Sequence, residues 1–273
     1  MADRWLTFDC YGTVADWNTC MSGAIETIAG VTGPAASRLL TAYHQAELEL
    51  EAAAKWCPYR EILTTGLARA AGREHITLPP GAETALVQGW PDMQVFADAG
   101  PALATLRERG WRLAFLTNCD DDLFAATRER LPVPFDLWVT AAEIHSYKPD
   151  LAHFRKFAEK TGAARENWIH VANSWVHDML PAARMGLRSV WVDRDLTGHP
   201  AKLADRRVTS MRRLPEAVSD VSAIPIGLST PVARSPKSGA ERAGEGGAVA
   251  GAGGGRGDAA VGLSQARDAG GGG

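Results

Sequence analysis

The chain has 273 residues, of which 45% are hydrophobic and 22% are charged, and its formal net charge is −3. This composition is typical of a soluble globular protein, long enough for one large domain or for a domain with an insertion. The near-neutral charge lacks the basic footprint of a nucleic-acid-binding protein. No apolar run reaches about eighteen residues, so we expect no membrane span.

The cysteines and the N-terminus point to a reducing compartment. Cys10, Cys20, Cys57 and Cys119 are scattered without the paired spacing of a zinc site or a disulfide framework. The N-terminus begins with charged residues and leads directly into an apolar run, without the apolar segment of a secretory signal. We therefore expect a cytoplasmic protein with reduced thiols.

Five short apolar runs are predicted to be strands that are buried on both faces. In chain order they are Arg4–Phe8, Arg112–Thr117, Leu137–Thr140, Trp168–Ala172 and Ser189–Val192. Helical patterns alternate with the later strands, and each ends near a glycine. These helices are expected at Pro101–Arg109, Asp150–Thr161 and Met179–Met185. The alternation predicts an α/β fold with a Rossmann-like parallel sheet.

Residues 17–90 interrupt the alternation, because their patterns are helical and no convincing strand occurs among them. The clearest helix is AYHQAELELEAAAKW, residues 42–56. We interpret residues 17–90 as a helical cap inserted after the first strand, and residues 1–16 and 91–221 as the core. Residues 222–273 are rich in glycine and alanine and lack aromatic residues, which predicts a disordered tail.

Polar residues follow the predicted strands where each strand ends. Ligands of open α/β sheets bind beyond these carboxyl ends, so the residues are candidates for a site. They are Asp9 after the first strand, Thr117 and Asn118 after the second, Lys148 after the third, and Asn173, Ser174, His177 and Asp178 after the fourth.

Asp9 ends an apolar strand, where a buried carboxylate needs a cation and hydrogen-bond donors to stay ionised. Lys148 is the candidate cation, and Thr117 and the backbone amides after Asp9 are candidate hydrogen-bond donors. An ionised, partly desolvated carboxylate is a usable nucleophile. Taken singly, each residue has a simpler explanation, since a strand-end aspartate is more often a cap or a turn residue. The ordered set favours a catalytic site.

Four segments carry a family resemblance. In chain order, FDCYGTV, FLTNCD, SYKPD and VANSWVHDMLPAARMGL resemble the four motifs of the haloacid dehalogenase superfamily. The resemblance covers residues 4 to about 195. It implies a Rossmann-like core, a helical cap after the first strand, and a nucleophilic Asp9 that forms a covalent intermediate with the substrate.

Two positions separate the branches of this superfamily. Its phosphatases have a second aspartate where this chain has Tyr11, and an acidic magnesium ligand where it has Asn173. Losing a carboxylate weakens a site for a hard cation. The sequence therefore resembles the type II branch, the L-2-haloacid dehalogenases. This resemblance implies a small carboxylate substrate, no metal or other cofactor and, because such enzymes are often dimers, a homodimer.

In the dehalogenase mechanism, Asp9 displaces halide from C2 of a 2-haloalkanoic acid, and water then hydrolyses the aspartyl ester to a 2-hydroxy acid. Lys148 would keep Asp9 ionised, and Asp178 would orient or activate the water. The resemblance also assigns substrate, leaving-group or nucleophile contacts to Tyr11, Thr13, Thr117, Asn118, Asn173 and Ser174.

The sequence departs from this branch at the halide site. Well-understood L-2-haloacid dehalogenases carry an arginine in the first cap helix, where this chain has His44. Either His44 binds the halide, or Arg60 does, or the enzyme does not expel halide. The fourth motif is also one residue longer than in those enzymes, and we expect its His177 to pack rather than to face the site.

Three alternatives stay open at this point. The same ester chemistry would serve a strained cyclic amino acid, whose ring opens to an amine and needs no halide site. A magnesium-dependent phosphatase of unusual motif is the second alternative. The third is a non-enzymatic scaffold with the glycine-rich tail as an interaction arm, although a scaffold has no need for both Asp9 and Lys148.

Overall fold

The computed structural model describes residues 3–53 and 55–224, so the predicted disordered tail lies, from residue 225 on, outside the described part. The described chain forms a parallel six-stranded sheet of order β3-β2-β1-β4-β5-β6. This confirms the predicted α/β class. The strands are β1 Arg4–Phe8, β2 Trp111–Thr117, β3 Leu137–Thr140, β4 Trp168–Ala172, β5 Arg188–Val192 and β6 Arg206–Val208.

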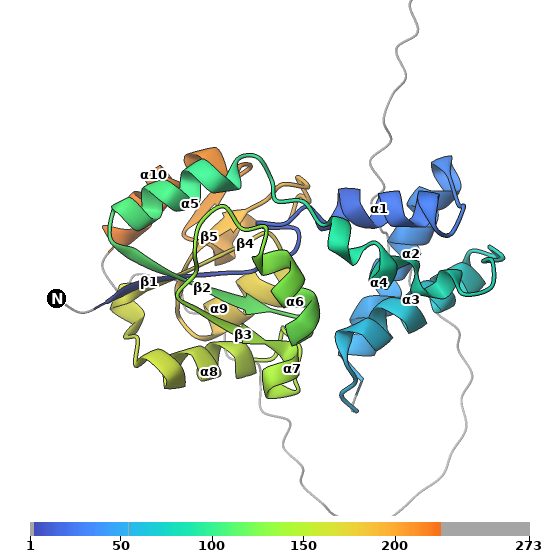
Figure 1. The fold of residues 1–273 in the computed structure, drawn as a ribbon. Helices are drawn as coiled ribbons and strands as arrows, with labels where there is room; N and C mark the ends of the chain where they lie inside the picture. The colour runs from blue at the N-terminus through green and yellow to red at the C-terminus, as the bar shows by residue number, and fades with distance from the viewer. Residues whose placement is uncertain (1–2, 54, 225–273) are drawn as a thin grey trace, which may run out of the picture. The chain divides into compact units, whose positions relative to one another are not determined.

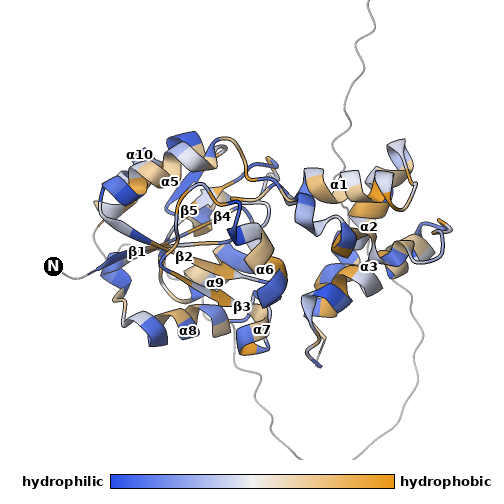
Figure 2. Cartoon of the chain, in the orientation of Figure 1, coloured by the Kyte–Doolittle hydropathy of each residue, from blue (hydrophilic) through white to orange (hydrophobic). Residues whose placement is uncertain are grey.

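Helices cover both faces of the sheet (Figure 1). Helices α5 (Ala99–Glu108) and α10 (Leu214–Ser222) pack on one face, and α8 (Ala152–Thr161) and α9 (Leu180–Arg184) pack on the other. Successive strand residues point to opposite faces of the sheet. Phe8 therefore packs in the apolar cluster on the side of α5 and α10, and Trp5 packs in the cluster on the side of α8 and α9. Figure 2 shows the strands β2 and β3 as mostly hydrophobic, and the outer helices as mixed.

The predicted strands agree with the observed ones to within one residue, but several elements were not predicted, including short helices such as α7 (Ala141–Ile144). Helices α6 (Asp121–Arg128) and α10 and the edge strand β6 were missed. Strand β6 reads RRV and is partly exposed, so it lacks the apolar run that marks a buried strand. Within residues 3–53 and 55–224, no helix is both long enough and apolar enough to cross a membrane.

Between β1 and α5 the described chain is helical. The helices are α1 Trp17–Thr27, α2 Gly33–Glu51, α3 Tyr59–Arg73, η1 Ala82–Thr84, α4 Ala85–Gln88 and η2 Trp90–Asp92. They gather beyond the carboxyl ends of the strands (Figure 1), and we keep the name cap for them. Helix α2 ends at Glu51 rather than at Trp56 as predicted, and a new helix begins at Tyr59, directly after Pro58.

The core holds the cap through the first turn of α3. The carboxylate of Asp120, which follows β2, accepts hydrogen bonds from the backbone N–H groups of Tyr59, at 2.8 Å, and of Arg60, at 3.0 Å. These are two of the N–H groups that a helix start leaves unpaired, and the helix dipole favours the negative charge there. The indole of Trp90 also donates to the carbonyl of Leu123, at 3.0 Å.

The loop after β1 is held by hydrogen bonds within the loop and by Arg194 from a distant part of the chain. The carbonyl of Cys10 accepts hydrogen bonds from the backbone of Thr13, Val14 and Ala15, and Gly12 takes φ +82°, which favours glycine. The guanidinium of Arg194 donates twice to the carbonyl of Thr13, at 3.1 and 2.9 Å. The side chains that follow Asp9 are therefore fixed in place.

The close packing of α4 against α1 predicts that a methyl group added at Gly89 lowers the stability of the protein. A Cβ at Gly89 would lie 2.4 Å from the Cβ of Ala24, which cannot rotate away. We expect Gly89→Ala to lower the free energy of unfolding by about 1–3 kcal/mol. Gly72→Ala on α3 is the matched control, because its Cβ would meet no atom within 4 Å. Urea unfolding of both variants checks this, and equal stabilities would contradict the close approach.

Candidate active site

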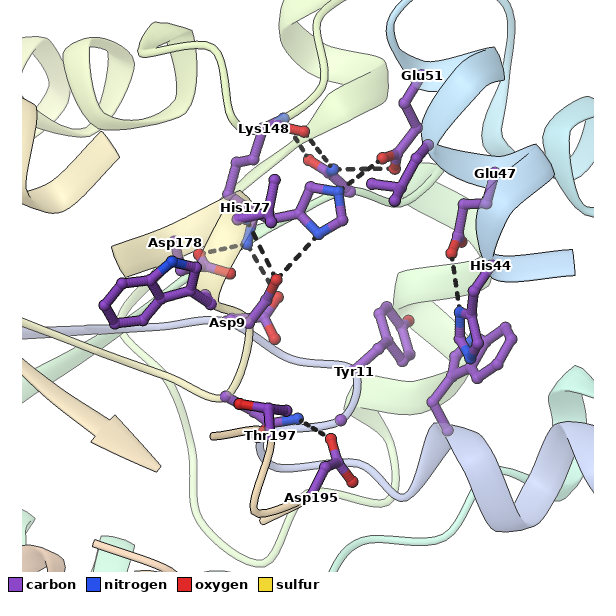
Figure 3. A pocket seen from close by; sticks show the side chains of 18 of the residues that line it. Asp9, Tyr11, His44, Glu47, Glu51, Lys148, His177, Asp178, Asp195 and Thr197 are labelled. Atoms are coloured by element: carbon purple, nitrogen blue, oxygen red, sulfur yellow. Dashed lines mark hydrogen bonds and ion pairs between the residues drawn. The ribbon is translucent and has the colours of Figure 1, made fainter. Parts of the chain in front are cut away.

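A cavity of about 340 Å³ lies between the strand ends and the cap. The structure brings most of the residues predicted from the sequence to this cavity, where Figure 3 shows several of them converging. Those that line it are Asp9, Tyr11, His44, Asn118, Lys148, Asn173, Ser174 and Asp178.

Asp9 is 7% exposed and has a hydrogen-bond donor on each carboxylate oxygen. Its Oδ1 accepts from Nζ of Lys148 at 2.9 Å, and its Oδ2 accepts from Oγ1 of Thr13 at 2.8 Å. The Thr13 hydroxyl accepts from the backbone N–H of Asn173, at 2.8 Å, so its own proton is directed to Asp9. Burial raises the pKa of Asp9, Lys148 opposes this, and the charge of Asp178 adds to it.

Lys148 joins two carboxylates at the bottom of the pocket. Its ammonium is 1% exposed and donates to Asp9 at 2.9 Å and to Oδ1 of Asp178 at 2.7 Å. Burial alone would lower the pKa of Lys148, but the two carboxylates outweigh it and raise the pKa above the usual value. Asn118 fixes the Lys148 backbone, accepting its N–H at 2.7 Å and donating to its carbonyl at 3.1 Å.

Asp178 receives a second donor on the same oxygen, from Nε2 of His170 at 3.0 Å. A chain of hydrogen bonds sets the tautomer of this histidine. The Trp168 indole can only donate, and it donates to Oγ1 of Thr7 at 2.7 Å. The Thr7 hydroxyl therefore directs its proton to Nδ1 of His170, at 2.8 Å, which leaves Nε2 to carry the proton toward Asp178.

The other oxygen of Asp178 is left free to act on a ligand. Burial raises the pKa of Asp178, but Lys148 and His170 outweigh burial and lower it to about 2. Oδ2 is buried and has no hydrogen-bond partner in the described part of the chain. An ionised carboxylate oxygen that lines a pocket without a partner is suited to orient a water molecule or another donor.

A wide helical turn brings Asp178 to this place. Residues Trp175–Met179 form a π-helical turn, and the side chain of Ser174 caps it by accepting from the backbone N–H of His177 at 3.2 Å. Such a turn accommodates one extra residue within a helix. A turn of this kind would hold the additional residue expected in the fourth motif.

His177 faces the pocket, so the expectation that it packs was wrong. Its Nε2 pairs with Oε2 of Glu51 in the cap, at 2.9 Å, and its Nδ1 lies 3.1 Å from Oγ of Ser174 (Figure 3). Burial lowers the pKa of His177, but the Glu51 carboxylate more than offsets this and raises the pKa to about 9. An imidazolium therefore bridges the core and the cap at neutral pH.

Two cap carboxylates of the site, Glu47 and Glu51, were not predicted from the sequence. Oε1 of Glu47 accepts from the hydroxyl groups of Tyr43, at 3.1 Å, and Tyr59, at 2.5 Å, and its Oε2 lies 3.3 Å from Nδ1 of His44. Burial raises the pKa of Glu47, but these donors outweigh burial and lower it. The spacing of His44, Glu47 and Glu51 was the available signal, since steps of three and four residues place them on one helix face.

Three predicted residues, Arg60, Thr117 and Thr13, do not line the cavity, although Thr13 bonds to Asp9. Arg60 pairs with Asp122 and approaches Asp120 at 3.7 Å, with its side chain 44% exposed, so the structure does not support it as a halide ligand. The acidic residues at the start of α6 attract its guanidinium. The Thr117 hydroxyl is buried away from the pocket, and its carbonyl lies 3.1 Å from Nε2 of His153.

The remaining wall is partly aromatic. The Tyr11 hydroxyl lies 3.1 Å from Oγ1 of Thr127, and burial raises the pKa of this phenol well above its usual value. Asn173 donates to Oδ2 of Asp195 at 2.9 Å. Further lining residues that were not predicted as site residues include Trp17, Asn18, Trp175, Asp195, Thr197 and His199.

No group of three or more histidine, cysteine, aspartate or glutamate side chains within the described ranges is arranged to hold a metal ion. The prediction that the reaction needs no metal stays a prediction.

The model of the haloacid dehalogenase-like hydrolase family matches residues 4–186. This chain belongs to that family of hydrolases. The match covers all four motifs at the strand ends, and the parallel sheet with helices on both faces agrees with it. The resemblance inferred from FDCYGTV, FLTNCD, SYKPD and the longer fourth segment is confirmed.

Curated relatives and solved structures agree with this assignment. An (S)-2-haloacid dehalogenase 4A from Burkholderia cepacia is 24% identical, over 72% of this chain and 85% of that protein. A phosphoserine phosphatase from Thermus thermophilus is 33% identical, over 60% of this chain and 68% of that protein. The crystal structure of an L-2-haloacid dehalogenase has a TM-score of 0.70 at 20% identity, over 80% of this chain and 100% of that one, which shows a shared fold.

The ion pair between His177 and Glu51 predicts a pH-dependent stability. The pKa of His177 is raised in the folded state, so its stabilisation is complete below the unfolded value of 6.5 and is lost as pH rises through about 9. Burial raises the pKa of Glu51, which offsets part of the gain. We expect His177→Gln to lower the free energy of unfolding by about 1–2 kcal/mol at neutral pH and by less above about pH 10.

Urea unfolding across this pH range measures the effect. Glu51→Gln is the matched variant, and the double variant should lose little more than either single one, because both remove the same pair. A His177→Gln penalty that stays constant from neutral pH to about pH 10 would contradict the assignment.

Proposed function

We propose that this hydrolase cleaves a bond between carbon and a leaving group in a small carboxylate, through an ester on Asp9, with 2-haloalkanoic acids as the leading substrates. The observation that carries the proposal is the buried Asp9 carboxylate, held by Lys148 and Thr13, in the pocket between the strand ends and the cap. Relatives named as (S)-2-haloacid dehalogenases, from Burkholderia cepacia and Pseudomonas putida, support the choice of substrate.

In the first step, a carboxylate oxygen of Asp9 attacks the carbon that bears the leaving group. The new C–O bond forms as the bond to halide breaks, and halide departs with the electron pair. The contacts to Lys148 and Thr13 orient the carboxylate, and Asn118 keeps Lys148 in place through its backbone. Orientation of this kind removes much of the entropic barrier to a bimolecular step.

In the second step, water attacks the carbonyl carbon of the ester. Oδ2 of Asp178 accepts a hydrogen bond from this water, while Lys148 and His170 hold Oδ1. With a pKa of about 2, Asp178 is a weak base and acts mainly by orienting the water. The alkoxide leaves with one proton of the water as a hydroxy acid, the second proton is released, and the Asp9 carboxylate is restored.

We also propose that the reaction needs no metal. Tyr11 stands where the superfamily's phosphatases carry a general acid and base, and its pKa is too high for that role at neutral pH. Asn173 stands where they carry an acidic ligand, and its amide nitrogen is bonded to Asp195. The match to a phosphoserine phosphatase makes phosphoryl transfer the reaction that a test must separate from this one.

A second candidate is the same ester chemistry on a small carboxylate whose leaving group is an amine, such as a strained cyclic amino acid. The cap favours it, because His44 stands in place of the halide-binding arginine and hydrogen-bonds to Glu47. Breaking the C–N bond of a protonated ring leaves a neutral amine on the product, so no halide site is required.

Halide release tests the leading proposal. We expect release from 2-chloropropionate or chloroacetate by the wild-type enzyme in the presence of EDTA, and a loss of at least about 10⁴-fold in Asp9→Asn, because the nucleophile is gone. Asp220→Asn, on the exposed side of α10, is the matched control and should keep full activity. Release that persists in Asp9→Asn would contradict the proposal, and magnesium-dependent turnover of a phosphate ester would favour the phosphatase.

A further inference from the structure

We propose that the pocket selects a substrate that carries a positively charged nitrogen beside its carboxylate, and that Glu47 in the cap binds this cation. The substrate class is therefore a small zwitterion, such as an amino acid, as in the second candidate above. This inference rests on the proposed function, because it names the substrate of the same pocket.

The formal charge of the pocket wall is strongly negative. Lys148 is the one lysine or arginine among the residues that line the cavity in the described part of the chain. The carboxylates that line it are Asp9, Glu47, Glu51, Asp178 and Asp195. A substrate that is only an anion meets like charge on both the core and the cap sides.

The cations of the pocket are already paired with its own acids. The Lys148 ammonium contacts Asp9 and Asp178, at 2.9 and 2.7 Å, and the His177 imidazolium contacts Glu51 at 2.9 Å. Neither is free to balance a substrate carboxylate by itself. Because the imidazolium directs its Nδ1 proton to Ser174, the Ser174 hydroxyl is left to donate to that carboxylate.

Within the described part of the chain, no lysine or arginine pairs with Glu47. Two of its contacts are the neutral hydroxyl groups of Tyr43 and Tyr59, and the third is His44, whose side chain is 45% exposed. These donors fix the carboxylate and, together with the charge of His177, lower its pKa, so that it stays ionised. A ligand ammonium would be a further, directly bound cationic partner.

Aromatic rings stand beside this carboxylate. Tyr11, Trp17 and Tyr59 line the cavity, and the Trp17 ring centroid lies 5.0 Å from that of His44 and 5.5 Å from that of Tyr43. Aromatic faces next to a carboxylate form a common recognition site for ammonium groups. The unpartnered Oδ2 of Asp178 shows that a second buried acceptor at this site also requires a donor from the ligand or from water.

Two ligands that differ by one ammonium group test the inference. Butyrate and L-2-aminobutyrate are titrated separately into the wild-type full chain at neutral pH and fixed ionic strength. Binding is followed by the fluorescence of the tryptophans, of which Trp17 and Trp175 line the cavity. We expect L-2-aminobutyrate to bind about tenfold more tightly, as one charge-assisted contact provides.

Glu47→Gln should abolish this preference, because the amide keeps the shape and removes the charge. Glu49→Gln is the matched control, since Glu49 lies on the same helix, is half exposed and pairs with Arg73 outside the cavity. It should leave the preference intact. If Glu47→Gln fails to fold, the wild-type comparison decides alone.

Equal or tighter binding of butyrate by the wild type overturns the inference, as does absence of binding by both ligands. A preference that survives in Glu47→Gln overturns the role of that residue. The halide assay with Asp9→Asn is a separate readout. Preference for the zwitterion without Asp9-dependent turnover would contradict the proposed function and leave this inference standing. Asp9-dependent halide release together with a preference for butyrate would support the proposed function and overturn this inference.

Discussion

The whole site depends on one buried ammonium group, that of Lys148, shared by the carboxylates of Asp9 and Asp178. Removing Lys148 would leave two carboxylates without their shared cation inside the protein, which costs about 3–5 kcal/mol. The sharing is unequal, because the pKa of Asp9 is raised by burial while that of Asp178 is lowered to about 2. In the proposed reaction, this difference suits Asp9 to act as the nucleophile and Asp178 to accept a hydrogen bond from water.

The sheet topology is what lets residues so distant in sequence share a charge. Asp9 follows β1, which lies between β2 and β4, and the strand order reverses direction at this point. Side chains beyond the neighbouring strand ends therefore meet there, including Lys148, which is 139 positions along the chain from Asp9. The cap covers the same space. Asp120 of the core binds the start of α3, and Glu51 at the end of α2 pairs with His177 of the core.

Much of the core could be predicted from the sequence, because strands buried on both faces are continuous apolar runs, and the polar residues that end them are conspicuous. The cap could be predicted as helical but not in its chemistry. Glu47 and Glu51 belong to a charged helix that reads as solvated, and their burial depends on Tyr59, His177 and Asn118, which come from other segments. Arg60 was misplaced for the same reason, since only the folded chain shows that Asp122 takes its charge.

The central claim is that Asp9 becomes covalently bonded to the substrate carbon, and isotope labelling tests it most directly. The enzyme, in excess over a substrate that it turns over, completes a single turnover in water enriched in ¹⁸O, and the peptide that contains Asp9 is analysed by mass spectrometry. Because water attacks the ester carbonyl, the account predicts ¹⁸O in the Asp9 carboxylate and none in the new hydroxyl group of the product. Label in the product alone, with Asp9 unlabelled, would show direct attack of water on the substrate and contradict the account.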